Sequence, residues 1–188
     1  MFRGNSLMKQ KVWIISGPAG VGKSTTAKQL ARQMKKSAYI SGDEISHMAV
    51  SGREKPWESE RANELVWKNI VSLSDNFLAA DYDVVVDWIA FWNDVQTYTS
   101  HWIEQGIEVR YVILWAEQDV HFQRDQHRPA GSQMGERVLI LRNEFLNSGA
   151  PGPYYLDNTT EELTRTIELI QDSAQFLLKQ NHRNGGIE

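Results

Sequence analysis

The sequence predicts an α/β protein built on a doubly wound parallel sheet, and two observations support that class. Short apolar runs of strand length alternate with longer segments whose apolar residues recur at helical spacing. The first apolar run leads into a glycine-rich turn and then into a helical segment, and aspartates follow the next two runs. Ligands of such sheets bind at the carboxyl ends of the strands, so these turns are the first candidates for a functional site.

The first half of the chain contains three predicted strands and two predicted helices. The strands cover residues 12–15, 38–40 and 84–86, and the third is continuously apolar, as in a parallel strand covered by helices on both faces. One helix begins at Lys23, and a longer one covers residues 57–80. Four apolar residues define the expected buried face of the longer helix: Val66, Ile70, Leu73 and Phe77.

The second half continues the alternation. A helix closed by Gly106 precedes a strand at residues 109–115, and a further helix covers about 119–126. Turn-forming residues then interrupt the pattern, which predicts an exposed mobile loop. A fifth strand is predicted at 154–156. The spacing of Thr159 and Glu162 predicts a capping box for a last helix, whose apolar residues are Ile167, Ile170, Ala174 and Leu177.

Length and composition favour one domain at residues 9–180, with a lid at about 124–136 and flexible ends at 1–8 and 181–188. The formal net charge of -4 offers no electrostatic reason to bind nucleic acid. The absence of cysteine excludes disulfides and thiol catalysis and fits a cytoplasmic protein. No membrane insertion is expected from apolar runs of strand length, and the five histidines lack metal-ligand spacing.

Residues 17–24 match the phosphate-loop pattern G-x-x-x-x-G-K-[ST] in full, between the strand and the helix that its mechanism requires. Backbone N–H groups of such a loop wrap around phosphate. Lys23 is expected to reach the β- and γ-phosphates of ATP, and Ser24 to coordinate Mg²⁺. The complete predicted nucleotide site is Gly17, Pro18, Ala19, Gly20, Val21, Gly22, Lys23, Ser24 and Thr25.

Two aspartates at strand ends are candidates for the chemistry beyond nucleotide binding. Asp43 could accept or orient the proton of an attacking hydroxyl, or it could cap the next helix. Asp87 follows an apolar strand, as a Walker-B aspartate does, and could act on Mg²⁺ or the acceptor, or simply belong to a turn. Trp88, Phe91 and Trp92 come next; core packing is the favoured role, and an acceptor wall is the alternative.

Arginines near the predicted lid could act on the transferring phosphoryl group. Arg124 and Arg128 share one helical face beside the loop and are predicted to close over the phosphates. The alternative is a solvated charged face with Asp125. Arg137 and Arg142 are weaker candidates for the same role.

With these features together, the chain resembles the nucleoside-monophosphate-kinase-like group of P-loop kinases over roughly residues 9–180. The resemblance implies a three-layer sandwich with a five-stranded parallel sheet in the order 2-3-1-4-5, a mobile lid and Mg·ATP as donor. Arg124 and the Arg128–Pro129 pair are similar to the lid of shikimate kinase, and chloramphenicol phosphotransferase uses as base an aspartate at the position that resembles Asp43.

The nearest resemblance is to gluconokinase. It rests on residues that follow the second predicted strand: Gly42, Asp43, Ser51, Gly52, Lys55, Pro56 and Trp57. The expected function is therefore ATP-dependent phosphorylation of a small-molecule hydroxyl, with gluconate or a related sugar acid as the leading acceptor. An antibiotic or nucleoside kinase is the alternative within enzymes. An ATP-binding regulatory module is the alternative from another class, and the acidic balance disfavours a nucleic-acid end kinase.

Overall fold

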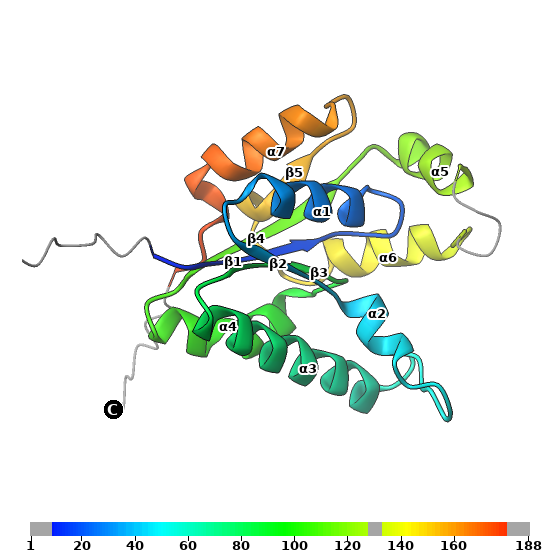
Figure 1. The fold of residues 1–188 in the computed structure, drawn as a ribbon. Helices are drawn as coiled ribbons and strands as arrows, with labels where there is room; N and C mark the ends of the chain where they lie inside the picture. Colours follow the sequence, from blue (N-terminus) through cyan, green and yellow to red (C-terminus); the bar gives the residue numbers. More distant parts are fainter. Residues whose placement is uncertain (1–8, 128–132, 180–188) are drawn as a thin grey trace, which may run out of the picture.

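The computed structural model describes residues 9–127 and 133–179. Within them, five parallel strands form one sheet in the order β2-β3-β1-β4-β5 (Figure 1), which confirms the expected strand order. The strands are β1 Lys11–Ser16, β2 Ser37–Ser41, β3 Asp83–Asp87, β4 Glu108–Trp115 and β5 Tyr155–Asp157.

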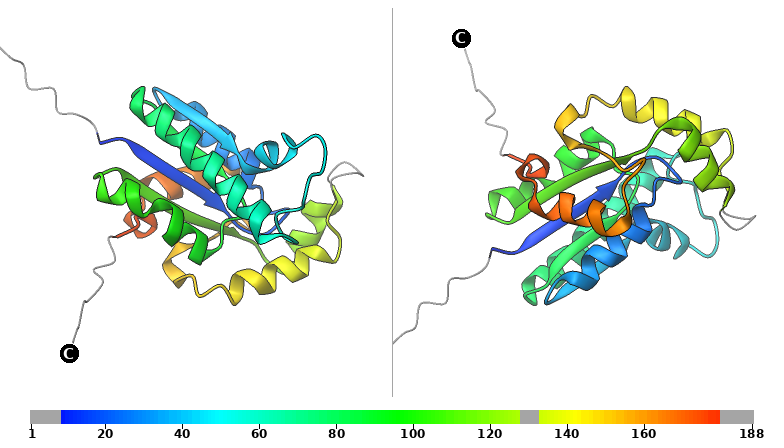
Figure 2. Two further views of the ribbon diagram at one scale, coloured as in Figure 1. Left: turned by 90° about the horizontal axis from the view of Figure 1, so that it is seen from below. Right: turned by 90° about the horizontal axis from the view of Figure 1, so that it is seen from above.

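Helices cover both faces of the sheet and confirm the three-layer arrangement. Seen from below, α3 and α4 lie over the sheet, and seen from above, α1 and α7 do (Figure 2). The described helices are α1 Lys23–Gln33, α2 Gly42–His47, α3 Glu60–Ala79, α4 Trp92–Glu104, α5 Gln118–Gln126, α6 Arg137–Leu146 and α7 Leu163–Asp172, with short 3-10 turns η1 Gly152–Tyr154 and η2 Ala174–Phe176. None of these helices is long and apolar enough to cross a membrane.

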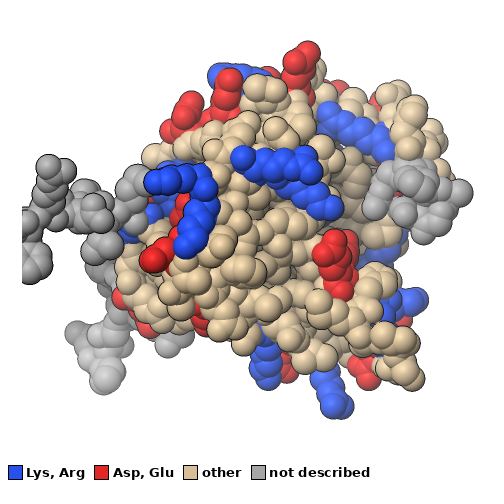
Figure 3. Space-filling model, in the orientation of Figure 1, with Lys and Arg blue, Asp and Glu red and all other residues tan. Residues whose placement is uncertain are grey.

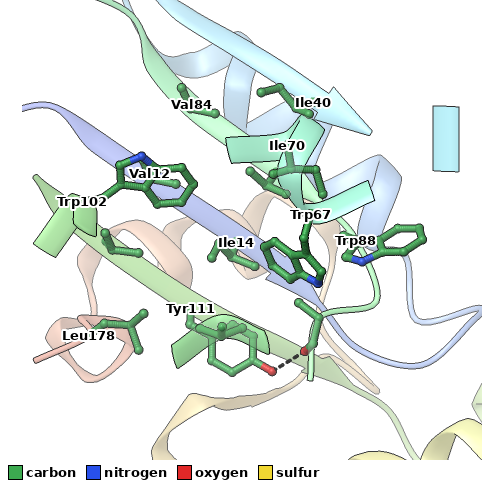
Figure 4. Close-up of a cluster of buried hydrophobic side chains, with 14 of the residues drawn as sticks. Val12, Ile14, Ile40, Trp67, Ile70, Val84, Trp88, Trp102, Tyr111 and Leu178 are labelled. Carbon is green, nitrogen blue, oxygen red and sulfur yellow. Dashed lines mark hydrogen bonds between the residues drawn. The ribbon is translucent and has the colours of Figure 1, made fainter. Parts of the chain in front are cut away.

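The strands are continuously apolar because their two faces enter two different cores. Val12 and Ile14 of β1 point into the cluster beneath α3 and α4, which contains Trp67 and Trp102 (Figure 4). The intervening residues of β1 pack into the other cluster with α1 and α7. Neither face of the central strand is exposed to solvent, so apolar and polar residues do not alternate in its sequence.

Strand register brings the candidate turns together. Ile15 of β1 lies beside Asp87 of β3, and Ser41 of β2 lies on the other side of the same aspartate. The phosphate loop follows β1 directly, and α2 follows β2. The carboxyl ends of three neighbouring strands therefore meet around Asp87.

Two expectations about helices are wrong. In α3, Leu73 and Phe77 are each 36% exposed, and the inward face instead carries Trp67, Ser74 and Leu78. The buried residues of α3 follow the i, i+4 spacing from Val66 through Ile70 to Ser74, so Leu73 lies to one side of the buried face. The helix also begins at Glu60, where the Ser59 side chain caps it, rather than at residue 57.

The predicted capping box and the extent of the last helix are also wrong. The N-cap of α7 is Glu162, and it makes no side-chain cap bond. The Thr159 hydroxyl instead accepts a hydrogen bond from the Glu117 N–H at 2.8 Å. Helix α7 ends at Asp172, and Ala174 begins a separate 3-10 turn. The Thr159 hydroxyl bonds to the segment before α5, so it does not cap α7 as the capping box would require.

Acidic and basic side chains are interspersed on the face drawn in Figure 3. The numbers of acidic and basic residues are nearly equal, and the two kinds of charge are mixed on that face.

Candidate active site

A cavity of about 480 Å³ lies at the carboxyl edge of the sheet. Asp43 and Asp87 both line it, which answers a question that the sequence left open. Six of the nine predicted nucleotide-binding residues line it as well: Ala19, Gly20, Gly22, Lys23, Ser24 and Thr25. Sequence reasoning assigned no cavity role to several other lining residues: Pro56, Asn63, Ile89, Met134, Leu141 and Glu144.

The loop between β1 and α1 has the backbone shape of a phosphate cradle. Gly17, Gly20 and Gly22 have positive φ angles of 130°, 88° and 94°, which side chains disfavour. A Cβ at Gly17 would also lie 2.3 Å from the Leu114 carbonyl oxygen, so only glycine fits there. Gly22 caps α1 without a side-chain bond, which leaves the first N–H groups of that helix available to an anion.

The three remaining loop residues support the cradle from behind. Gly17, Pro18 and Val21 are buried and do not line the cavity. The Lys23 ammonium donates a hydrogen bond to the Pro18 carbonyl at 2.9 Å. The Val21 carbonyl accepts one from the Asn158 side chain at 2.9 Å. These residues set the loop's shape rather than its ligand-facing surface.

Asp87 is held by a hydroxyl from the neighbouring strand. It is 5% exposed, and its Oδ2 accepts a hydrogen bond from the Tyr39 hydroxyl at 2.8 Å. Burial, followed by the charge of Asp87, raises the pKa of Tyr39 far above its ordinary value. The phenol therefore keeps its proton and remains a donor to the carboxylate. The sequence offered no signal for this pairing, because Tyr39 reads as an ordinary strand residue.

Asp43 is exposed at the start of α2 and is free of the capping role. The N-cap of α2 is Ser41, whose hydroxyl accepts the Glu44 N–H at 3.3 Å. The helix begins one residue earlier than Asp43, at Gly42, where a Cβ would lie 2.2 Å from the Trp88 ring. The glycine lets this helix pack closely on Trp88, and the alternative of Asp43 as the cap is wrong.

The aromatic residues after β3 divide between two roles. Trp88 is 5% exposed and belongs to the core, yet it also lines the cavity, as does the partly buried Phe91. Trp92 packs between Tyr111 and Tyr154, with ring centroids 6.1 and 5.2 Å away, and does not line the cavity. All three aromatic residues therefore pack in the core, and Trp88 and Phe91 also form part of the cavity wall.

The arginines occupy different positions. Arg124 lines the cavity, and its guanidinium donates to Asn158 Oδ1 at 3.0 Å and to the Asn158 carbonyl at 2.9 Å. Arg128 lies outside the described residues. Arg137 lines the cavity, whereas Arg142 does not: it donates to the Ala116 carbonyl and to a histidine ring. Arg142 is therefore removed from the phosphate-facing candidates.

His121 is a fully buried residue behind the phosphate loop that sequence reasoning left without a role. Its Nδ1 accepts a hydrogen bond from Arg142 at 2.8 Å, which places the proton of the neutral ring on Nε2. A Cβ at Gly20 would lie 3.5 Å from the His121 ring. Burial, and then the charges of Arg142, Lys23 and Arg124, lower the pKa of His121 to about 4. The ring is neutral at neutral pH.

Among the residues that the structure describes, no three histidine or acidic side chains gather to hold a metal ion. Ser24 and Asp87 line one cavity, however, and Mg²⁺ is commonly held by one or two protein oxygens together with substrate phosphates. This donor set suits Mg²⁺ bound with a nucleotide.

The glycine loop between β1 and α1, the aspartate at the end of β3 and the strand order together define a P-loop protein with the kinase fold. A family model described as AAA domain (AAA_33) matches residues 12–140, and the chain belongs to this P-loop kinase family. A sequence search of curated proteins gives no match.

Three solved structures illustrate the fold similarity. A gluconokinase from Sinorhizobium meliloti 1021 is 20% identical with a TM-score of 0.59, over 85% of this chain and 88% of that one. A tunicamycin resistance protein from Deinococcus radiodurans is 20% identical with a TM-score of 0.59, over 87% and 94%. The APS kinase CysC from Mycobacterium tuberculosis, solved with AMPPNP and APS, is 17% identical with a TM-score of 0.61, over 87% and 96%.

Proposed function

We propose that this protein transfers the γ-phosphoryl group of ATP to a hydroxyl of a small molecule. The observation that carries the proposal is the shared cavity, which is lined by the phosphate loop, by Asp87 and by the exposed carboxylate of Asp43. A site that only binds nucleotide has no need of a second free carboxylate beside the loop. Mg·ATP, when bound, would supply the phosphoryl group and neutralise part of its charge.

Each residue has a proposed role. Lys23 and the loop N–H groups would hold the phosphates, and Ser24 and Asp87 would hold the magnesium ion. Asp43 orients the acceptor hydroxyl and takes its proton as the new P–O bond forms, while the bond from the γ-phosphorus to the bridging oxygen breaks and ADP leaves with its electron pair. Arg124, at the cavity wall, and Arg128 close over the phosphates and exclude water.

The acceptor that we propose first is gluconate or a related sugar acid. The support is the resemblance of Gly42, Asp43, Pro56 and Trp57 to gluconokinase, together with the placement of Asp43, Pro56 and Trp57 on the cavity wall. A second candidate is an antibiotic or nucleoside with an apolar or aromatic body, which the Trp88 ring in the same wall favours. The cytoplasm remains the location predicted from the cysteine-free composition.

The decisive assay follows ADP release from Mg·ATP with a panel of acceptors and checks product masses. The panel contains gluconate, other sugar acids, neutral sugars, shikimate, nucleosides, aminoglycosides and phenicols. A product that gains one phosphate supports the proposal and names the acceptor class. ATP binding without transfer to any member would favour the regulatory module instead.

Asp43→Asn tests the proposed base. The amide cannot take the proton, so kcat should fall by about 10²–10⁴-fold while ATP affinity stays nearly unchanged. The matched control is Glu44→Gln, which removes the adjacent exposed carboxylate that does not line the cavity. Turnover of Asp43→Asn equal to that of the control would remove Asp43 from the mechanism.

A further inference from the structure

One end of the cavity is built by residues from distant segments. Pro56 and Trp57 come from the connection between α2 and α3, Phe91 from the start of α4, and Glu144 from α6. These four residues also line a neighbouring depression that no phosphate-loop residue reaches. They therefore mark the acceptor end of the proposed site.

Trp57 contacts three charged side chains at this end of the cavity. It is 47% exposed, yet its indole N–H donates to Glu58 Oε1 at 3.2 Å. The Lys55 ammonium lies 5.6 Å from the ring centroid, and the Arg137 guanidinium carbon lies 4.8 Å from it. A guanidinium held over an aromatic ring by a cation–π interaction can still donate its N–H groups to another acceptor.

Arg137 has unused donor capacity. Its buried Nε has no hydrogen-bond partner among the described residues. Glu58 pairs with Lys55 instead, with 3.0 Å between the charged atoms. Glu144 lines the same cavity from the same helix, but among the described residues no ion pair joins it to Arg137. Arg137 lines the cavity without an ion-pair partner among the described residues, so an anionic ligand that supplies an acceptor to the guanidinium gains binding free energy.

We propose that the acceptor carries an anionic group, and that Arg137, whose guanidinium lies over the Trp57 ring, binds it at the end of the molecule remote from the reacting hydroxyl. The anion takes the free N–H groups in the plane of the guanidinium, a geometry that suits the two oxygens of a carboxylate, sulfate or phosphate. This inference rests on the proposed function for the identity of the cavity. It adds that Arg137 is a specificity-determining residue.

The test measures binding rather than transfer, so it stands apart from the test of the phosphotransferase activity. The phosphate loop is first saturated with Mg·AMPPNP, which leaves the acceptor end for the probes. Calorimetry then compares matched pairs: gluconate with sorbitol, 4-hydroxybenzoate with 4-hydroxybenzamide, and a nucleoside 5′-monophosphate with its nucleoside. At least one anion should bind about 10- to 100-fold more tightly than its neutral partner, as expected for a charge-assisted hydrogen bond. The pair that shows the preference distinguishes carboxylate from phosphate.

Arg137→Gln should abolish that preference and leave AMPPNP binding unchanged, and Arg137→Lys should keep part of it because the charge remains. The matched control is Arg165→Gln, which removes an exposed arginine that pairs with Glu168 on α7. An anion preference that survives Arg137→Gln would overturn the inference, as would equal binding of neutral partners or no binding by any pair. Equal weakening of both members of a pair with a lower Tm would indicate a structural role and would also overturn it.

Discussion

The carboxylate of Asp87 is positioned by a partner that no local pattern reveals. Tyr39 reaches it from the adjacent strand, where paired residues 39 and 85 place the ring two residues before the end of β3. Lys28 lies 5.1 Å from the centroid of the same ring. The hydroxyl fixes one carboxylate oxygen and leaves the other for a ligand.

Tyr39→Phe should weaken magnesium-dependent activity. The variant keeps the ring but removes the donor, so the Asp87 carboxylate loses a hydrogen bond worth roughly 1.5–3 kcal/mol and its fixed orientation. The magnesium concentration for half-maximal activity should rise several-fold, and the Tm should fall by several degrees because the lost hydrogen bond is partly buried. A magnesium titration at fixed ATP measures it, beside Tyr154→Phe as a control outside the cavity. An identical magnesium dependence in the two variants would contradict the role given to Tyr39.

At the scale of elements, the connection between β5 and α7 ties the phosphate loop to α5. Asn158, in this connection, is 6% exposed. Its amide N–H donates to Val21 of the loop, its Oδ1 accepts from Arg124 of α5, and its backbone N–H donates to Trp115 at the end of β4 at 2.8 Å. Arg124 is thus oriented by the same side chain that holds the loop. Any movement of α5 toward a ligand is coupled to the cradle through this amide.

Asn158→Ala should loosen that junction. The Val21 carbonyl and the Arg124 guanidinium each lose a partner in a buried region, which should lower the free energy of unfolding by about 1–3 kcal/mol. ATP affinity should fall, because the loop amides are less well held, while kcat at saturating ATP should fall less. Calorimetric ATP titration and chemical denaturation measure the two effects. Asn69→Ala, which removes an exposed amide bonded within α3, is the control; equal effects in both variants would refute the coupling.

At the scale of the whole molecule, buried polar groups make stability depend on pH. His121 has a pKa of about 4 in the folded protein, below its ordinary value of 6.5. Between these values the unfolded chain binds a proton that the folded protein does not, so stability falls as pH drops from about 6.5 toward 4. The groups that act on the ring are Arg142, Lys23 and Arg124, which oppose its protonation, and Asp125, which favours it.

His121→Asn should flatten that dependence. Wild type should lose at most about 3 kcal/mol of unfolding free energy from this group between pH 6.5 and 4, and the variant should lose correspondingly less, although its stability at pH 7 can be lower. Denaturation midpoints at several pH values give the slopes. His101→Asn serves as control, because that ring is partly exposed beside Asp75. Equal slopes in wild type and His121→Asn would show that His121 does not titrate in this way.

Local sequence was enough to predict much of the molecule. The phosphate loop is eight consecutive residues whose glycines, lysine and serine act on one ligand, so its chemistry is readable without a fold. The five strands were also readable, because runs buried on both faces are apolar throughout. Short helix α2 was missed since six residues carry too little periodicity to register.

The fold class, the nucleotide loop and the two aspartates that follow strands are predictable from the sequence, because each depends on neighbouring residues or on strand direction. The packing of distant segments accounts for three further features: Asp43 and Asp87 share a cavity, Tyr39 donates a hydrogen bond to Asp87, and the Arg137 guanidinium lies over the Trp57 ring. Tyr39 and Asp87 are 48 residues apart in the sequence, and Trp57 and Arg137 are 80 residues apart. Their meeting depends on strand order and helix packing, which no local spacing encodes.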